Sequence, residues 1–212
     1  FSLSTSIVAN TWIAKYDLDG NVLNLISPTH PQSENDLLFD FVEAGQVTTD
    51  DDGNIYISGD MFGFFLFGEN NPIVANNFRV FVAKLNVNFE WQWAKSLRVD
   101  IPQNNTYQPK LTVVNSRNTV VLTNFGFGNI IYYTELDDQE VIDFECSGSG
   151  TLDLIISQLK SSDGEWLSSN LIPGTVENVS IDIVSTGDDV YIAGARCINT
   201  ERTDGVLVNL MI

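Results

Sequence analysis

A phrase that recurs along the chain constrains the fold more than any other feature of the sequence. It reads WIAKY at residues 12–16 and FVAKL at residues 81–85, and shorter versions occur at residues 156–159 (ISQL) and 207–210 (LVNL). A polar turn and a second apolar run follow each of the first three copies, with Gly or Asn available for a positive φ at the turn. Each of these copies therefore predicts a β-hairpin.

A second hairpin is predicted within every unit. Its returning strand reads IYISG at residues 55–59, VVLTN at residues 120–124 and VYIAG at residues 190–194, and a short turn and another strand precede each of them. Two hairpins in a unit mean four antiparallel strands, and helical periodicity does not extend over a useful length. The single repeat region, residues 1–212, divides into units at residues 12–78, 79–151 and 152–203, with the first strand of a fourth unit at residues 204–212.

Four antiparallel strands in each repeat, with insertions, is the pattern of β-propeller blades. The expected fold is all-β: a β-propeller-like array of four-stranded antiparallel blades, about three blades plus one strand, incomplete as a closed ring. The two long connectors, residues 60–79 and 125–153, are apolar enough to carry an extra strand or to cover an edge of the core.

The repeat also resembles a known family. FVAKLN and WQWAKS, with DDGNIYISGDMFG before them, resemble the repeat of bacterial-type β-propeller proteins, which also occurs in large DNA viruses. The match is strongest over residues 46–97, and Gln158 and Asn209 replace the lysine of the repeat in the later units. The resemblance implies a propeller fold, and a fold alone does not assign a function.

The number of units predicts how the array is completed. Propellers usually close with about four to eight blades, and residues 1–15 stand at the same phase of the repeat as residues 195–209. An open array leaves an apolar face and strand edges uncovered. We therefore expect further blades of the same protein, or other subunits, to complete it, and the start at Phe1 fits a processed or partial chain.

The charge of the chain excludes some classes of partner. Asp and Glu number 28 against 10 Lys and Arg, which gives a net charge of −18 at pH 7. Such a surface repels the phosphates of nucleic acids and of anionic lipids. The longest apolar stretches, such as residues 61–68, are too short to span a membrane. A protein partner with a basic surface is expected instead, and Asp50, Asp51 and Asp52 are the candidates for an interaction rim.

Two aspartate-rich turns are weak candidates for a calcium site. Asp17 and Asp19 precede Gly20, and Asp50 and Asp52 flank Asp51 in a similar turn. Carboxylates are the ligands that calcium prefers, but neither turn completes an EF-hand. Asp, Asn and Gly also favour tight hairpin turns for conformational reasons alone, and this second interpretation is the preferred one.

The recurring lysines and the tryptophans are best explained by structure. Lys15 and Lys84 hold equivalent positions, and a catalytic residue would not be expected once in every unit, so we expect the ammonium groups to bind carbonyls or carboxylates at an edge. The tryptophans are predicted to lie in cores between blades, although an exposed row of them could stack on sugar rings. They are Trp12, Trp91, Trp93 and Trp166.

The remaining candidates give no enzymatic pattern. His30 is the only histidine and is expected in a surface loop, without a partner that suggests a Ser-His-Asp arrangement. Cys146 and Cys197 follow the fourth strands of consecutive units and could form a bridge. Asn104 and Asn178 begin N-glycosylation sequons.

We therefore expect a non-enzymatic structural or protein-interaction module, without catalytic residues or a cofactor, at a cell surface, in the extracellular space or in a virion. Two alternatives remain open. A carbohydrate-binding or carbohydrate-cleaving propeller would gather aromatic and acidic side chains on one face. A calcium-dependent adhesion module would use the aspartate-rich turns.

Overall fold

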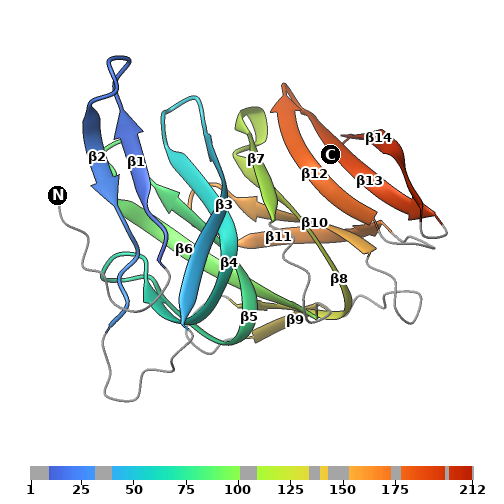
Figure 1. Ribbon diagram of the computed structural model, residues 1–212, viewed down its shortest axis with the longest axis horizontal. Helices are drawn as coiled ribbons and strands as arrows, with labels where there is room; N and C mark the ends of the chain where they lie inside the picture. Colours follow the sequence, from blue (N-terminus) through green and yellow to red (C-terminus); the bar gives the residue numbers. More distant parts are fainter. Residues whose placement is uncertain are drawn as a thin grey trace.

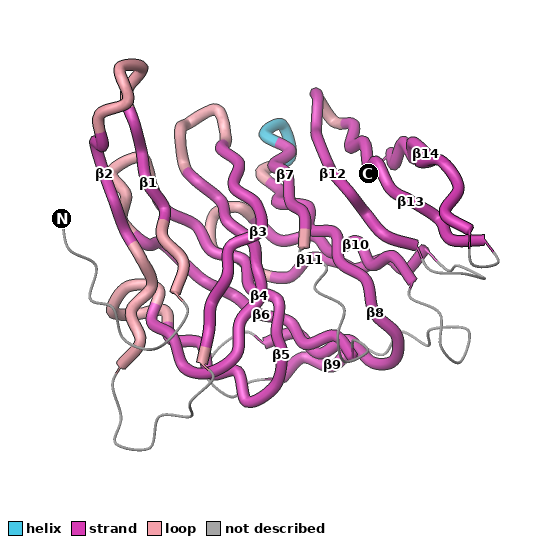
Figure 2. Tube along the Cα trace, in the orientation of Figure 1, coloured by secondary structure: helices cyan, strands magenta, loops and turns pink. Residues whose placement is uncertain are grey.

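The computed structural model of the protein describes residues 10–31, 40–100, 109–133, 139–142, 153–172, 178–198 and 201–211. Within these ranges the chain is all-β, and its one helical segment is a short 3-10 turn at Asn115–Arg117 (Figure 2). The predicted all-β fold class is confirmed. The described strands are, in chain order, β1 (Ile13–Tyr16), β2 (Val22–Ile26), β3 (Phe41–Thr49), β4 (Ile55–Leu66), β5 (Pro72–Leu85), β6 (Trp91–Asp100), β7 (Lys110–Val114), β8 (Thr119–Tyr133), β9 (Gln139–Ile142), β10 (Asp153–Lys160), β11 (Trp166–Ile172), β12 (Asn178–Thr186), β13 (Asp189–Ile198) and β14 (Glu201–Met211).

All six predicted hairpins form as antiparallel pairs. The long connectors contain strand structure, as expected. The first becomes the far end of the β4–β5 hairpin, where Phe65, Phe67 and Ile73 are buried. In the second connector, β8 continues to Tyr133 and pairs with β9.

Hydrogen bonding groups the strands into four antiparallel arrays, which we call the first to the fourth sheet. The first sheet is β1–β2, the second is β3–β4–β5–β6, the third is β7–β8–β10–β11 and the fourth is β12–β13–β14. Each of the last three combines the second hairpin of one sequence unit with the opening strands of the next. The sheets are therefore offset by half a unit from the repeat of the sequence.

The second and third sheets are not separate. The far half of β8, from Phe127 onward, pairs with β6 and β9, so the strands of the second and third sheets form one continuous nine-stranded sheet with β9. The apolar residues 125–133 explain this difference, because they extend β8 well past the predicted five-residue strand. The described strands do not close into a ring.

Successive sheets pack face to face through three apolar cores. Side chains alternate between the two faces of a strand, so Phe81 and Leu85 of β5 contact the first sheet while Val82 lies on the side of the third. The core between the first and second sheets includes Ile13, Ile57, Phe65, Phe81 and Leu85. The next core includes Tyr56, Val82, Trp93, Leu122 and Ile155, and the last includes Val121, Ile156, Ile183, Val190 and Ile192.

The strands β3, β7 and β12 lie side by side and link the sheets through polar contacts. The backbone N–H of Leu111 donates to Oε1 of Gln46 at 2.9 Å, and the hydroxyls of Thr112 and Ser185 lie 3.1 Å apart. The hydroxyl of Ser185 also donates to the carbonyl of Val113. Because the sheets follow one another in this order, the first and fourth sheets stand at opposite ends of the molecule (Figure 1).

Candidate functional site

The two aspartates at the start of the candidate calcium turns close their own hairpins. Oδ1 of Asp17 accepts hydrogen bonds from the backbone N–H groups of Asp19 (2.9 Å) and Asn21 (2.8 Å), and its Oδ2 accepts from the amide of Asn21. The bonds from Asn21 lower the pKa of Asp17. Gly20, at φ 85°, supplies the left-handed conformation that this turn requires.

Asp50 makes the same contacts in the next turn. Its Oδ1 accepts from the backbone N–H of Asn54 at 2.8 Å, and its Oδ2 accepts from the amide of Asn54 and from the hydroxyl of Tyr56 at 2.9 Å. Partial burial disfavours the charge, but these bonds and the nearby Lys84 outweigh it and lower the pKa of Asp50. Asn86 has the equivalent role in the β5–β6 turn.

This geometry accounts for the aspartates without an ion. A calcium ion needs several oxygens directed at one point, whereas both oxygens of Asp17 and of Asp50 face donors of their own turns. Asp19 and Asp52 lie exposed beside them. In the part of the chain that the structure describes, no three His, Cys, Asp or Glu residues form a ligand set. A calcium-dependent function stays a prediction.

The hairpin turns of β1–β2, β3–β4, β7–β8 and β12–β13 gather at one edge of the molecule, which we call the turn edge (Figure 1). Neighbouring turns contact each other there. The backbone N–H of Asp51 donates to Oδ1 of Asn115 at 3.2 Å, and the hydroxyl of Ser116 donates to the carboxylate of Asp188. The rim candidates Asp51 and Asp52 are exposed at this edge, whereas Asp50 is turned into its own hairpin.

Lys84 links the second and third sheets, as the repeat predicts for a structural lysine. Its Nζ donates to the carbonyl of Ser161 at 2.9 Å and lies 5.2 Å from the centre of the Tyr56 ring. Nε1 of Trp93 donates to the same carbonyl at 3.1 Å. Burial lowers the pKa of Lys84, and Asp50 and Asp52 oppose that shift. The equivalent Lys15, in the first sheet, is exposed.

The expected surface position of His30 is wrong for its side chain. The imidazole is only 4% exposed, and its Nε2 lies 2.9 Å from Oδ2 of Asp40, which is 8% exposed. The ring packs edge-on against Phe65, with the ring centres 5.3 Å apart. This pair ties residues 27–31 to the start of β3. No sequence pattern reveals it, because the space for Asp40 comes from Gly63 on β4, where a Cβ atom would overlap the carboxyl group.

Two acidic residues, Asp60 and Glu43, face each other on adjacent strands. Asp60 of β4 stands directly opposite Glu43 of β3. Burial, and secondly the charge of Glu43, raise the pKa of Asp60 to about 7. The sequence does not single out either residue among 28 acidic side chains, because only the fold desolvates Asp60 and sets it opposite Glu43.

Three of the four tryptophans pack in or against the cores, as predicted. Trp93 is buried, Trp166 packs against the same core, and Trp91 contacts Phe67 with ring centres 5.1 Å apart. Trp12 instead is exposed, and it lines an open hollow of about 400 Å³ with Phe41 and Glu43. An exposed aromatic ring beside a carboxylate is compatible with sugar binding, and the carbohydrate alternative stays a prediction.

Comparisons with known proteins do not identify the chain. No protein-family model matches it, and no curated protein matches it. The resemblance to bacterial-type propellers therefore stays a prediction. In the described ranges, no helix is long and apolar enough to cross a membrane.

The cysteine and sequon predictions are untested. Cys146 and Asn104 lie outside the described residues, and the side chains of Cys197 and Asn178 are not described.

Proposed function

We propose that the chain is a non-enzymatic structural and protein-interaction module, built as part of a β-propeller-like array. Two observations support the propeller architecture. The four sheets follow one another in chain order and pack face to face, as blades do. The first strands of the last three sheets, β3, β7 and β12, lie side by side, as the inner strands of adjacent blades do.

The observation that carries the interaction role is the charge of the turn edge. Its four turns carry seven acidic residues and one basic residue, Arg117, which lies 3.7 Å from Asp188. The adjoining β10–β11 turn, where the backbone N–H of Ser161 donates to the carbonyl of Asn118, adds Lys160 together with Asp163 and Glu165. Such an edge attracts a partner with a basic surface and speeds its encounter. A scaffold in the extracellular space, on a cell surface or in a virion is the setting we propose. The acidic residues of the four turns are Asp17, Asp19, Asp50, Asp51, Asp52, Asp188 and Asp189.

Charge reversal at the turn edge tests this role. We would measure the binding of polylysine to the intact chain and to the variants Asp51→Lys and Glu69→Lys. Asp51 is exposed and its carboxylate does not close the turn, unlike that of Asp50, so its replacement leaves the hairpin intact. Glu69 is also exposed but lies in the β4–β5 turn, at the opposite end of β4. Both variants change the net charge by the same amount.

We expect Asp51→Lys to weaken binding about threefold or more at low salt, and Glu69→Lys to have a smaller effect. The difference should disappear at high salt because the attraction is screened. Equal weakening by both variants would mean that only the total charge matters, and would contradict a specific role for the turn edge.

A further inference from the structure

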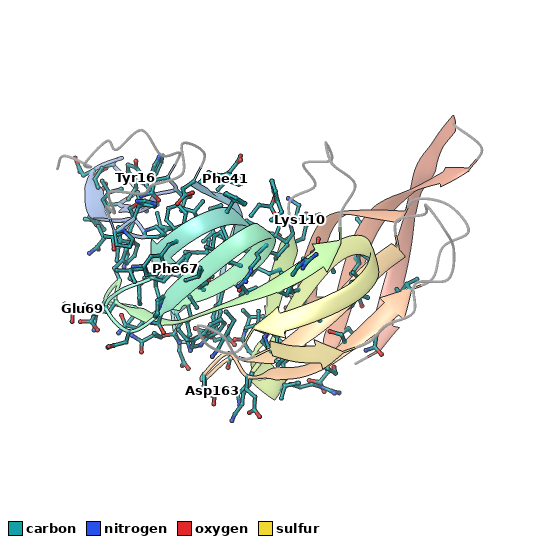
Figure 3. All side chains as sticks on the ribbon, turned by 90° about the horizontal axis from the view of Figure 1, so that it is seen from below. Tyr16, Phe41, Phe67, Glu69, Lys110 and Asp163 are labelled. Atoms are coloured by element: carbon teal, nitrogen blue, oxygen red, sulfur yellow. The ribbon has the colours of Figure 1, made fainter. Side chains whose placement is uncertain are left out.

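The outer face of the first sheet exposes large apolar side chains. Tyr16 and Val22 are 52% and 43% exposed and stand directly opposite each other in the β1–β2 hairpin, and Trp12, just before β1, is 55% exposed and borders the hollow that it shares with β3. We call this the front face. Figure 3 shows Tyr16 with the β1–β2 hairpin at one end of the molecule. Burial of such side chains is favourable at roughly 25 cal/mol per Å² of apolar surface, so this face is suited to a partner.

The equivalent positions of the repeat are fully buried in the next two sheets. Phe81 and Leu85 of β5 correspond to Trp12 and Tyr16, and both are 0% exposed in a core that includes Ile13 of the first sheet and Phe67 of the β4–β5 hairpin. Ile155 and Leu159 of β10 are 1% and 0% exposed beneath the second sheet. In both cases residues of the preceding sheet share the core on this face, whereas among the described residues no preceding sheet lies against the front face.

The face of the fourth sheet that points away from the third sheet also exposes apolar side chains. Val184 is 58% exposed and stands opposite Tyr191 in the β12–β13 hairpin. The corresponding pair in the third sheet is Thr112 and Val121, which are 6% and 0% exposed beneath the fourth sheet. We call the surface around Val184 and Tyr191 the rear face. Inside the molecule, a face of this kind always receives the next sheet.

We infer that the front face of one copy of this chain docks on the rear face of a second copy. The two faces stand at opposite ends of the molecule (Figure 1), so both remain accessible in each copy. The contact repeats the face-to-face packing that joins the sheets within the chain. Because it joins two different surfaces, it is head-to-tail, and it leads to a closed ring or to an open chain of copies. Tyr16 and Val22 flank the β1–β2 turn, and Val184 and Tyr191 flank the β12–β13 turn, so the contact adjoins the turn edge. The inference rests on the array architecture proposed above but not on the binding of a basic partner.

Sedimentation velocity over a range of protein concentrations tests this inference. The net charge of −18 makes copies repel each other, so raised salt should favour association. We expect the wild-type chain to associate. The double variant Trp12→Ser, Tyr16→Ser removes the large apolar side chains of the front face, and Val184→Asp places a charge on the rear face. Each variant should associate at least tenfold more weakly than the wild type. Leu167→Ser is the matched control, because Leu167 is 50% exposed on β11, away from both faces.

Mixing the front-face variant with the Val184→Asp variant tests whether the contact is head-to-tail. Each retains one intact face, so an equimolar mixture should form a dimer and nothing larger. Far-UV circular dichroism of each variant confirms that it is folded. A wild-type chain that stays monomeric at high concentration and salt would overturn the inference and leave these faces to a different protein. Association that the Val184→Asp variant retains, or a mixture that stays monomeric, would also overturn it.

Discussion

Neighbouring aspartates in the β3–β4 turn have different roles because their surroundings differ. Asp50 accepts three hydrogen bonds from Asn54 and Tyr56, whereas Asp51 is exposed and only its backbone N–H has a contact. An exposed surface charge of this kind contributes little to stability, while loss of hydrogen bonds to a charged group costs about 1.5–3 kcal/mol each. One residue holds the turn and the other is available to a partner.

Asp60 should make the stability of the protein depend on pH. An aspartate in an unfolded chain titrates near pH ~4, whereas the folded protein raises the pKa of Asp60 to about 7. Between these pH values the folded state holds a proton that the unfolded state has released, so the free energy of unfolding falls as the pH rises. One pKa unit corresponds to about 1.4 kcal/mol, so the fall should reach a few kcal/mol between pH 4 and pH 8.

Urea unfolding of Asp60→Asn at pH 5 and pH 8 measures this contribution. The variant keeps the size of the side chain but cannot ionise, so it should lose less stability than the wild type over this interval. Asp51→Asn is the control, because Asp51 is exposed and should leave the pH dependence unchanged. An equal loss of stability in wild type and Asp60→Asn would show that Asp60 does not titrate here.

At the scale of the elements, an irregularity in β4 makes room for the buried His30–Asp40 pair. The register of β4 against β5 shifts between Met61 and Gly63, and Gly63 has a φ of 103°. A side chain at this position would overlap the carboxyl group of Asp40. The strand therefore has to contain a glycine where Asp40 packs against it.

Gly63→Ala should destabilise the protein more than Gly20→Ala. Both glycines have a positive φ, which costs alanine roughly 1–2 kcal/mol, but nothing lies within 4 Å of a Cβ atom at Gly20. The overlap with Asp40 should bring the cost of Gly63→Ala to about 3 kcal/mol or more, measured by urea unfolding. Asp40→Ala in the same chain should recover part of that excess. Equal costs at the two glycines would exclude the steric explanation.

At the scale of the whole molecule, the position of a sheet in the array decides whether an apolar residue is buried. Trp12 and Phe81 occupy the same position of the repeat, but Phe81 lies inside an apolar core and Trp12 is 55% exposed beside an open hollow. The same contrast separates the buried Val121 from the partly exposed Tyr191 at the other end. The same position of the repeat therefore contributes to the stability of one chain where it is buried, as at Phe81, and to the inferred association between chains where it is exposed, as at Trp12.

Phe81→Ala and Trp12→Ala should separate these two roles. In dilute solution, Phe81→Ala should lower the free energy of unfolding by about 3–5 kcal/mol because it leaves a cavity in the core. Trp12→Ala should change it by less than about 1 kcal/mol, since the side chain is exposed. Denaturant unfolding at low protein concentration measures both. A large cost for Trp12→Ala under these conditions would mean that Trp12 is covered within a single chain.

The sequence by itself determined the hairpins. The alternation of apolar residues, with turns such as Asp50 to Asn54, predicts all six, because strand pairing across a short turn depends on neighbours in the chain. It also predicts the structural role of Lys84, since the residue recurs with the repeat.

Only the tertiary structure decided the features that depend on residues far apart in the sequence. The extension of β8 that joins the second and third sheets, the burial of His30 against Asp40, and the raised pKa of Asp60 all arise where separate strands meet. The same holds for the exposure of Trp12. Equivalent residues carry the same local pattern, and burial differs because it depends on which sheet lies against them.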